Sequence, residues 1–133
     1  MIILNIKKDV PMTDNIKHIN SQTIEGLKML QEDGEPDFLA DLIDTLLKTT
    51  PQKIVNIDNF LNQNDLVAAS KESHSIKSSV RALGAEKLGN ICQSLEDLKA
   101  TNRVDDAKNI FSTLKEEYEL VTKELNEIKG SLK

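Results

Sequence analysis

Between residues 37 and 129 the chain contains almost no Gly or Pro, since only Pro51, Gly84 and Gly89 occur in this stretch. An all-β domain of this length needs a turn after every few residues, and turns prefer Gly and Pro. Apolar residues instead recur at the i, i+3, i+4, i+7 spacing of amphipathic helices. The sequence therefore predicts an all-α fold.

Composition narrows the class of protein. The 133 residues suit one domain, and 38% hydrophobic with 29% charged residues is the balance of a globular chain. The net charge of −5 argues against sequence-independent binding of nucleic acid, which requires a basic surface. Trp is absent and other aromatics are scarce, which argues against base stacking, so no nucleic-acid partner is expected.

Sulfur and imidazole groups are also scarce. Cys92 is the single cysteine, which excludes an internal disulfide and a cysteine-based metal cluster. His18 and His74 have no ligand spacing around them, so neither a metal nor a cofactor of its own is expected. No apolar run is long enough for a membrane span or a secretory signal, which predicts a cytoplasmic protein without a membrane partner.

The helical pattern begins after an N-terminal extension or arm, which we assign to residues 1–19, and residues 20–130 are predicted to form one helical domain. A short additional helix is expected from an N-cap at Ser21 to about Gln31. The segment from Asp33 to Pro36 then breaks the pattern.

Four longer helices follow. The first is predicted over residues 38–62 as one helix kinked at Pro51, with an apolar stripe that starts at Phe38. The second is expected to start from an N-cap at Asn64 and to close at Gly84 in the left-handed conformation. The others are predicted over residues 85–100 and 102–128. Short connections between long helices predict an antiparallel up-and-down bundle.

The second long helix places its apolar residues in an arc of about 100°, and His74 lies about 130° from the centre of that arc, so its imidazole faces water. Lys71, Lys77, Ser78 and Arg81 lie at i−3, i+3, i+4 and i+7, on the same side. This cationic surrounding disfavours imidazolium and favours an anion. By the pattern alone, however, an exposed histidine among lysines is most often an ordinary solvated surface.

A second residue is brought towards His74 if the chain reverses near Ala85. His74 and Glu96 are each eleven residues from that point, so helical rise places them at the same height. A carboxylate that accepts from one ring nitrogen would leave the other nitrogen as a nucleophile. An ordinary solvated glutamate fits the pattern equally well.

Residues 74–98, HSIKSSVRALGAEKLGNICQSLEDL, resemble the signature of the histidine-containing phosphotransfer (HPt) domains of His-Asp phosphorelays. That signature runs His-x-Leu-Lys-Gly-Ser, then Leu-Gly-Ala, then a Leu and a Cys or small residue, then Leu-Glu. The match is in register without gaps at His74, Lys77, Ser79, Leu83, Gly84, Ala85, Leu88, Cys92, Leu95 and Glu96.

This resemblance extends over roughly residues 20–128 and implies an antiparallel four-helix bundle that carries a phosphoryl group on His74. It implies that Lys77 neutralises the phosphoryl oxygens and that Glu96 orients the imidazole. The chain would act as a phosphoryl carrier without ATP-dependent kinase activity. The residues expected on the partner-binding face are Lys71, Ser78, Arg81 and Gln93.

The partners that the resemblance implies are response-regulator receiver domains and an upstream hybrid histidine kinase. The phosphoryl group would pass between receiver aspartates, and the Mg²⁺ needed for transfer would belong to the receiver. The chain itself is expected to be a monomer.

Two positions depart from the family pattern: Ser78 replaces the usual Gly, and Ile76 replaces the usual Leu. Cys92 is interpreted as a small buried apolar residue. His18 lies outside the motif and is expected to be inert.

Three other functions compete with the relay. A histidine kinase needs a nucleotide-binding region, and the chain has neither the room nor a Gly-rich phosphate loop. A catalytically silent adaptor would bind receivers without transferring phosphate, and Ser78 is the feature that favours it. A purely structural helical bundle is the third. The joint presence of His74, Lys77 and Glu96 favours the relay.

Overall fold

The computed structural model describes residues 18–30 and 38–132, and every regular element in these two ranges is an α-helix. The all-α prediction is therefore confirmed. The predicted break from Asp33 to Pro36, the end of the first helix at Gln31 and most of the extension lie outside the described residues. The helices are α2 (Ser21–Leu30), α3 (Phe38–Asn62), α4 (Leu66–Ala82), α5 (Glu86–Glu96) and α6 (Val104–Ser131).

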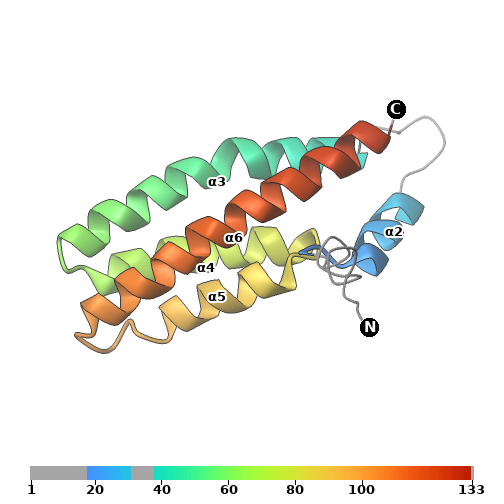
Figure 1. Cartoon of the computed structure of the whole chain (residues 1–133). Helices are drawn as coiled ribbons and strands as arrows, with labels where there is room; N and C mark the ends of the chain where they lie inside the picture. Colours follow the sequence, from blue (N-terminus) through green and yellow to red (C-terminus); the bar gives the residue numbers. More distant parts are fainter. Residues whose placement is uncertain (1–17, 31–37, 133) are drawn as a thin grey trace, which may run out of the picture.

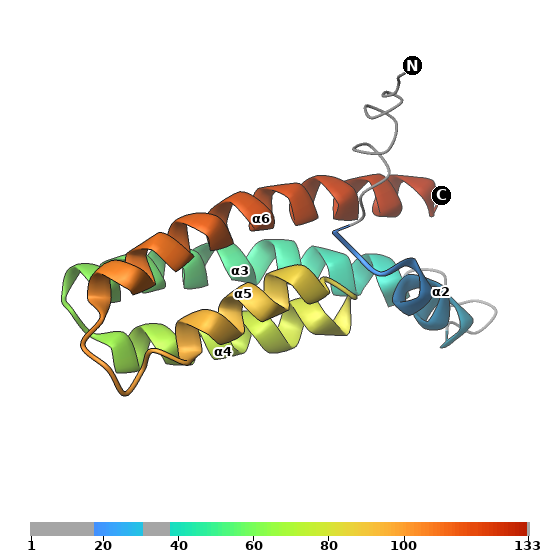
Figure 2. The ribbon, with the colours of Figure 1, turned by 60° about the horizontal axis from the view of Figure 1, so that its bottom comes forward.

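Helices α3 to α6 form an antiparallel up-and-down bundle (Figure 1). Helix α3 packs against α4 and α6, and α5 packs against the same two helices, so the four close into a ring. Helix α2 lies outside the ring, beyond the end where α3 begins and α6 ends (Figure 2). This is the predicted four-helix bundle with an additional N-terminal helix.

The core is apolar and continuous through the bundle. The helical period of α4 and its C-terminal end predicts one buried face, and its residues are all buried: Leu66, Ala69, Ser73, Ile76, Val80 and Leu83. Phe38 was predicted to be in the core, but it is 39% exposed, because it is the first residue of α3 at the open end of the bundle. Ile19, from the predicted extension, is only 1% exposed and belongs to the same core.

Helix α3 runs through Pro51 without ending, so the prediction of a single helix there is confirmed. Pro51 has no N–H to donate to the carbonyl of Leu47. The apolar stripe on both sides of it continues, with Ile43 and Ile57 fully buried. Tertiary packing of this face outweighs the lost hydrogen bond.

The start of α2 differs from the prediction. Asn20, rather than Ser21, is the N-cap, because its side-chain oxygen accepts from the N–H groups of Gln22 at 2.8 Å and Thr23 at 3.4 Å. The backbone N–H of Asn20 also donates to the carbonyl of Gly84 at 2.8 Å. Gly84 has φ +86°, as predicted, and a Cβ there would stand 2.9 Å from Thr23, so the segment before α2 docks on this turn.

Helix α4, in contrast, begins one residue later than predicted. Asp65 is the N-cap and accepts from the N–H of Ala68 at 3.0 Å. Asn64 has φ +58° and lies in the preceding turn, a conformation that Asn tolerates better than most residues.

The predicted end of α5 at Ala100 is wrong. The helix ends at Glu96, and the chain continues in tight turns, with the N–H of Leu98 donating to the carbonyl of Leu95 at 3.1 Å. Leu98 remains 9% exposed, so it continues the apolar period without being helical. Helix α6 begins two residues later and ends three residues later than predicted. Because α5 ends at residue 96, Glu96 stands at the C-terminus of its helix.

Candidate functional site

His74 and Glu96 meet across the α4–α5 turn. Nδ1 of His74 lies 3.1 Å from Oε2 of Glu96. The His74 side chain is 62% exposed, whereas that of Glu96 is 14% exposed. The structure thus brings together the two residues that the turn at Gly84 places at one height, and it leaves most of the imidazole in contact with solvent.

Glu96 also contacts Lys77, whose Nζ lies 2.7 Å from Oε1. Burial alone would raise the pKa of Glu96, but the hydrogen bonds and positive charges of Lys77 and His74 outweigh it and hold this pKa below its ordinary value. An ionised carboxylate only accepts hydrogen bonds. Nδ1 of His74 must therefore carry the proton that it shares with Glu96, and Nε2 of the neutral ring keeps its lone pair.

Lys77 was predicted to lie on the exposed side of α4, and this is wrong. Its side chain is only 13% exposed, because it leans across to α5. There Nζ donates to Oε1 of Gln93 at 2.7 Å, in addition to its contact with Glu96. Gln93, predicted to bind a partner, donates from Nε2 to Oδ1 of Asp97 at 2.7 Å. Sequence reasoning missed Asp97, although its i+4 spacing from Gln93 is a usable signal.

Arg81 leans across to α5 as well. Its Nη2 donates to Oδ1 of Asn90 at 2.8 Å, and its Nε lies 3.8 Å from Oε1 of Glu86. A Cβ at position 89 would stand 2.6 Å from Nε of Arg81, so Gly89 provides the space for this side chain. The Arg81 side chain therefore contacts α5 and points away from His74's predicted neighbours on the exposed side of α4.

Lys71, another predicted partner-binding residue of α4, lies beside His74. Both line an open pocket of about 610 Å³ that also includes Val67, Lys99 and Ala100. Val67 is 54% exposed although it is apolar. Sequence reasoning missed this residue, and the available signal was its i−7 position relative to His74, which places it on the same face.

Ser78, the main departure from the family pattern, turns back onto its own helix. Its Oγ donates to the carbonyl of His74 at 3.3 Å, the i−4 contact common for serine in helices. The hydroxyl group is thereby held at the helix surface rather than projected from it.

A buried hydrogen bond joins α4 to α5 beneath the site. Ser73, which is fully buried, donates from Oγ to the carbonyl of Cys92 at 2.9 Å and so ties α4 to α5 directly beneath His74. Burial raises the pKa of the Cys92 thiol to about 11, so the thiol stays protonated. This agrees with the interpretation of Cys92 as a buried apolar residue.

His18 lies away from this site. Its Nδ1 is 2.7 Å from Oε2 of Glu117, and its backbone N–H donates to Oε1 of Glu124 at 2.9 Å. Glu117 is 3% exposed, and its other oxygen lies 3.6 Å from Nζ of Lys87. These contacts anchor the segment before α2 to α6, so His18 has a structural position that the sequence did not indicate.

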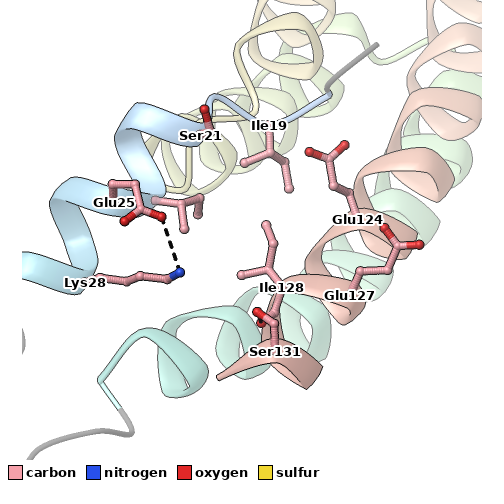
Figure 3. Close-up of a pocket in the computed structure, with 9 residues that line it drawn as sticks. Ile19, Ser21, Glu25, Lys28, Glu124, Glu127, Ile128 and Ser131 are labelled. Carbon is pink, nitrogen blue, oxygen red and sulfur yellow. Dashed lines mark hydrogen bonds and ion pairs between the residues drawn. The ribbon is translucent and has the colours of Figure 1, made fainter. Parts of the chain in front are cut away.

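Another pocket, of about 260 Å³, lies between α2 and α6 (Figure 3). Ile19 and Ile128 face each other across it, with Glu124 and Glu127 at its α6 side. It contains none of the predicted site residues. In the described ranges, no three His, Cys, Asp or Glu side chains gather in an arrangement that could hold a metal ion.

None of the helices in the described part of the chain is long and apolar enough to cross a membrane.

Comparison with known proteins finds relatives by sequence and a solved counterpart by fold. The chain is 27% identical over 97 residues to the phosphorelay intermediate protein rdeA of Dictyostelium discoideum, covering 73% of this chain and 38% of that protein. It is 26% identical over 110 residues to histidine-containing phosphotransfer protein 4 of Arabidopsis thaliana, covering 81% and 86%. This chain thus spans well under half the length of the Dictyostelium protein.

The fold has a solved counterpart in the histidine-containing phosphotransfer protein B of Pseudomonas aeruginosa PAO1. The TM-score is 0.77 at 20% sequence identity, and the match covers 88% of this chain and 98% of that one. The family model of the Hpt domain matches residues 41–127, which include all four bundle helices in whole or in large part and every residue around His74. The chain belongs to the Hpt domain family.

Proposed function

We propose that this protein relays a phosphoryl group between aspartates of response-regulator receiver domains by way of His74. The observation that carries this proposal is the 3.1 Å contact of Nδ1 with Glu96 beneath an imidazole that is 62% exposed. The contact fixes the tautomer, and the exposure leaves Nε2 accessible to a partner.

The transfer can be written with all bonds accounted for. The Nε2 lone pair of His74 attacks the phosphorus of a receiver's aspartyl phosphate, forming an N–P bond while the P–O bond to the aspartate breaks. The aspartate leaves as a carboxylate. In the next step an aspartate of a second receiver attacks the same phosphorus, and the ring recovers its lone pair on Nε2.

The surrounding charges support both steps. Glu96 stabilises the positive charge that develops on the ring when Nε2 forms its bond. Lys77 balances the carboxylate and provides a positive charge towards the incoming phosphoryl oxygens. This protein would therefore act as a carrier, without ATP-dependent kinase activity of its own.

The proposed docking face is the surface of α4 around His74. Val67 and Lys71 provide an apolar and a basic contact on one side of the ring, and Ser78 lies one turn further along on the other side. The partners we propose are receiver domains, which bring the Mg²⁺ required for transfer, and an upstream hybrid histidine kinase. We further propose that the chain works as a monomer in the cytoplasm.

A silent adaptor with the same fold is the alternative, and it is not favoured. Such a protein needs the docking face but has no need for a fixed imidazole tautomer. Here His74, Glu96 and Lys77 are held together by contacts of 3.1 Å and 2.7 Å. Ser78, the residue that pointed towards an adaptor, lies folded against its own helix.

The proposal is tested by incubating the protein with a receiver that carries a ³²P-labelled aspartyl phosphate. The protein should become labelled, and the label should be lost in acid and retained in base, as expected of a phosphohistidine. His74→Gln should abolish labelling with an unchanged helical circular dichroism spectrum, whereas His18→Gln should keep it. Labelling that persists in His74→Gln would exclude His74 as the phosphoryl acceptor.

A further inference from the structure

A chain of polar contacts leads from His74 along the surface of α5. Glu96 joins His74 to Lys77, with distances of 3.1 Å and 2.7 Å. Lys77 then donates to Gln93 at 2.7 Å, and Gln93 donates to Asp97 at 2.7 Å. The proposed function uses the first three residues, and it gives no role to Gln93 or Asp97.

The ammonium group of Lys77 has three N–H donors. Two of them face acceptors on α5, namely Oε1 of Glu96 and Oε1 of Gln93. A third N–H is left for an oxygen of the phosphoryl group. A lysine side chain loses considerable rotamer freedom when its ammonium group is fixed. Because Lys77 is already held and only 13% exposed, that loss occurs before a phosphoryl group arrives.

We propose that Gln93 is a positioning residue for phosphoryl transfer, which holds Lys77 in place, and that Asp97 fixes the orientation of the Gln93 amide. This inference rests on the proposed function of His74. Asp97 accepts from Nε2 of Gln93 and thereby keeps Oε1 towards Lys77. Without Asp97, the amide can rotate by half a turn and present its NH₂ group to the ammonium group, which cannot accept a hydrogen bond.

The proposed positioning of Lys77 also depends on the lack of charge on the Gln93 side chain. A carboxamide oxygen holds the ammonium group without adding negative charge to the site. Glutamate at position 93 would place a second carboxylate on Lys77, next to Glu96. The positive charge of Lys77 would then be shared between two anions, and the phosphoryl oxygens would meet a more negative surface.

Two variants separate positioning from charge. Gln93→Met removes the acceptor at nearly constant side-chain length and should slow transfer from a phosphorylated receiver to His74 by about two- to fivefold, the scale of one partly exposed charged contact. In Gln93→Glu the fraction of protein labelled at equilibrium should be lower than in Gln93→Met, because the added carboxylate disfavours the phosphoryl group. Gln52→Glu is the matched control, since it adds the same charge on α3, where Gln52 donates to Asn56 of its own helix. It should transfer like the wild type.

A double-mutant cycle with Lys77→Ala identifies how Gln93 acts. If Gln93 works through Lys77, Gln93→Met should cause no further loss of rate in the Lys77→Ala background. Asp97→Ala should reproduce the loss seen in Gln93→Met and add nothing to it. A loss from Gln93→Met that persists without Lys77 would indicate a separate structural or docking role and would overturn the proposal.

The outcomes also separate this inference from the function on which it rests. If the wild-type protein takes no label on His74, the relay itself is refuted and the role of Gln93 falls with it. If the wild type is labelled normally and Gln93→Met transfers equally fast or faster, only the positioning role is overturned. Circular dichroism melts of each variant show whether a slower rate reflects a loss of folded protein.

Discussion

Glu96 is the last residue of α5, and its carboxylate lies 3.1 Å from Nδ1 of His74 on the neighbouring helix. The contact joins a largely buried anion to a largely exposed ring. Because the anion can only accept, it determines which ring nitrogen carries the proton. The tautomer of His74 is thus determined by a residue that is largely buried.

Removing that anion should change the tautomer of His74. In Glu96→Ala, the proton is no longer held on Nδ1, and the neutral ring should shift towards the form protonated on Nε2, the usual preference of free imidazole side chains. The ¹⁵N chemical shifts of the two ring nitrogens above neutral pH report this directly. Phosphorylation should slow in parallel. Identical ¹⁵N shifts in the two proteins would mean that Glu96 does not select the tautomer.

Acid should remove the same contact by protonating Glu96. The folded-state pKa of Glu96 lies below the ordinary value of 4.5, so the carboxylate contributes stability above that pH and loses it as the pH falls through the lower folded-state value. Glu96→Gln cannot titrate. The difference in free energy of unfolding between the two proteins should be largest at neutral pH and shrink as the pH falls below 4.5 in urea denaturation series. A difference that stays constant over this range contradicts the assignment.

Lys77→Ala should affect both stability and transfer. The side chains of Lys77 and Glu96 are 13% and 14% exposed, so removing the lysine leaves a largely buried carboxylate with one partner fewer. We expect a loss of about 1–3 kcal/mol in the free energy of unfolding. Transfer should slow several-fold, and the phosphorylation equilibrium should move towards the receiver. Lys53→Ala, which removes a lysine that donates to Ser75 on α4, is the control for transfer.

Ser78→Gly restores the residue typical of the family. Helix propensity predicts a loss of about 0.5 kcal/mol, because glycine is the poorer helix former. The Ser78 hydroxyl donates to the carbonyl of His74 at 3.3 Å, but its methylene group still occupies space one turn from the ring. The variant should therefore accept phosphoryl groups from a wider panel of phosphorylated receivers. A panel result identical to that of the wild type would show that Ser78 does not affect specificity.

The sequence predicted α4 well because its signals agree with one another. Its apolar residues follow the helical period from Leu66 to Leu83, and Gly84 closes the turn with the φ that only glycine adopts freely. The caps were harder to predict. Asn64 and Asp65 are adjacent and equally suited to an N-cap, and the backbone conformation of Asn64 decides between them. Such a choice depends on the packing of the whole turn.

The site was predictable where a side chain is short and less so where it is long. The meeting of His74 with Glu96 follows from helical rise and the position of one turn. Lys77 and Arg81 have long flexible chains, so the angle of the Cα around the helix does not determine where their charges lie. Arg81 reaches α5 because residue 89 is glycine, and this depends on a contact between helices that no single-helix pattern contains.

The open position of His74 also determines the order of events in a relay. A donor and an acceptor receiver would have to reach the same exposed ring, so the two cannot be bound at the same time. In such a relay each round would consist of two successive encounters, with the phosphorylated carrier released between them. Tight binding to either partner would prolong its residence and slow the whole sequence. Under the proposed relay, weak and short-lived complexes with each receiver would therefore favour a high overall rate of transfer.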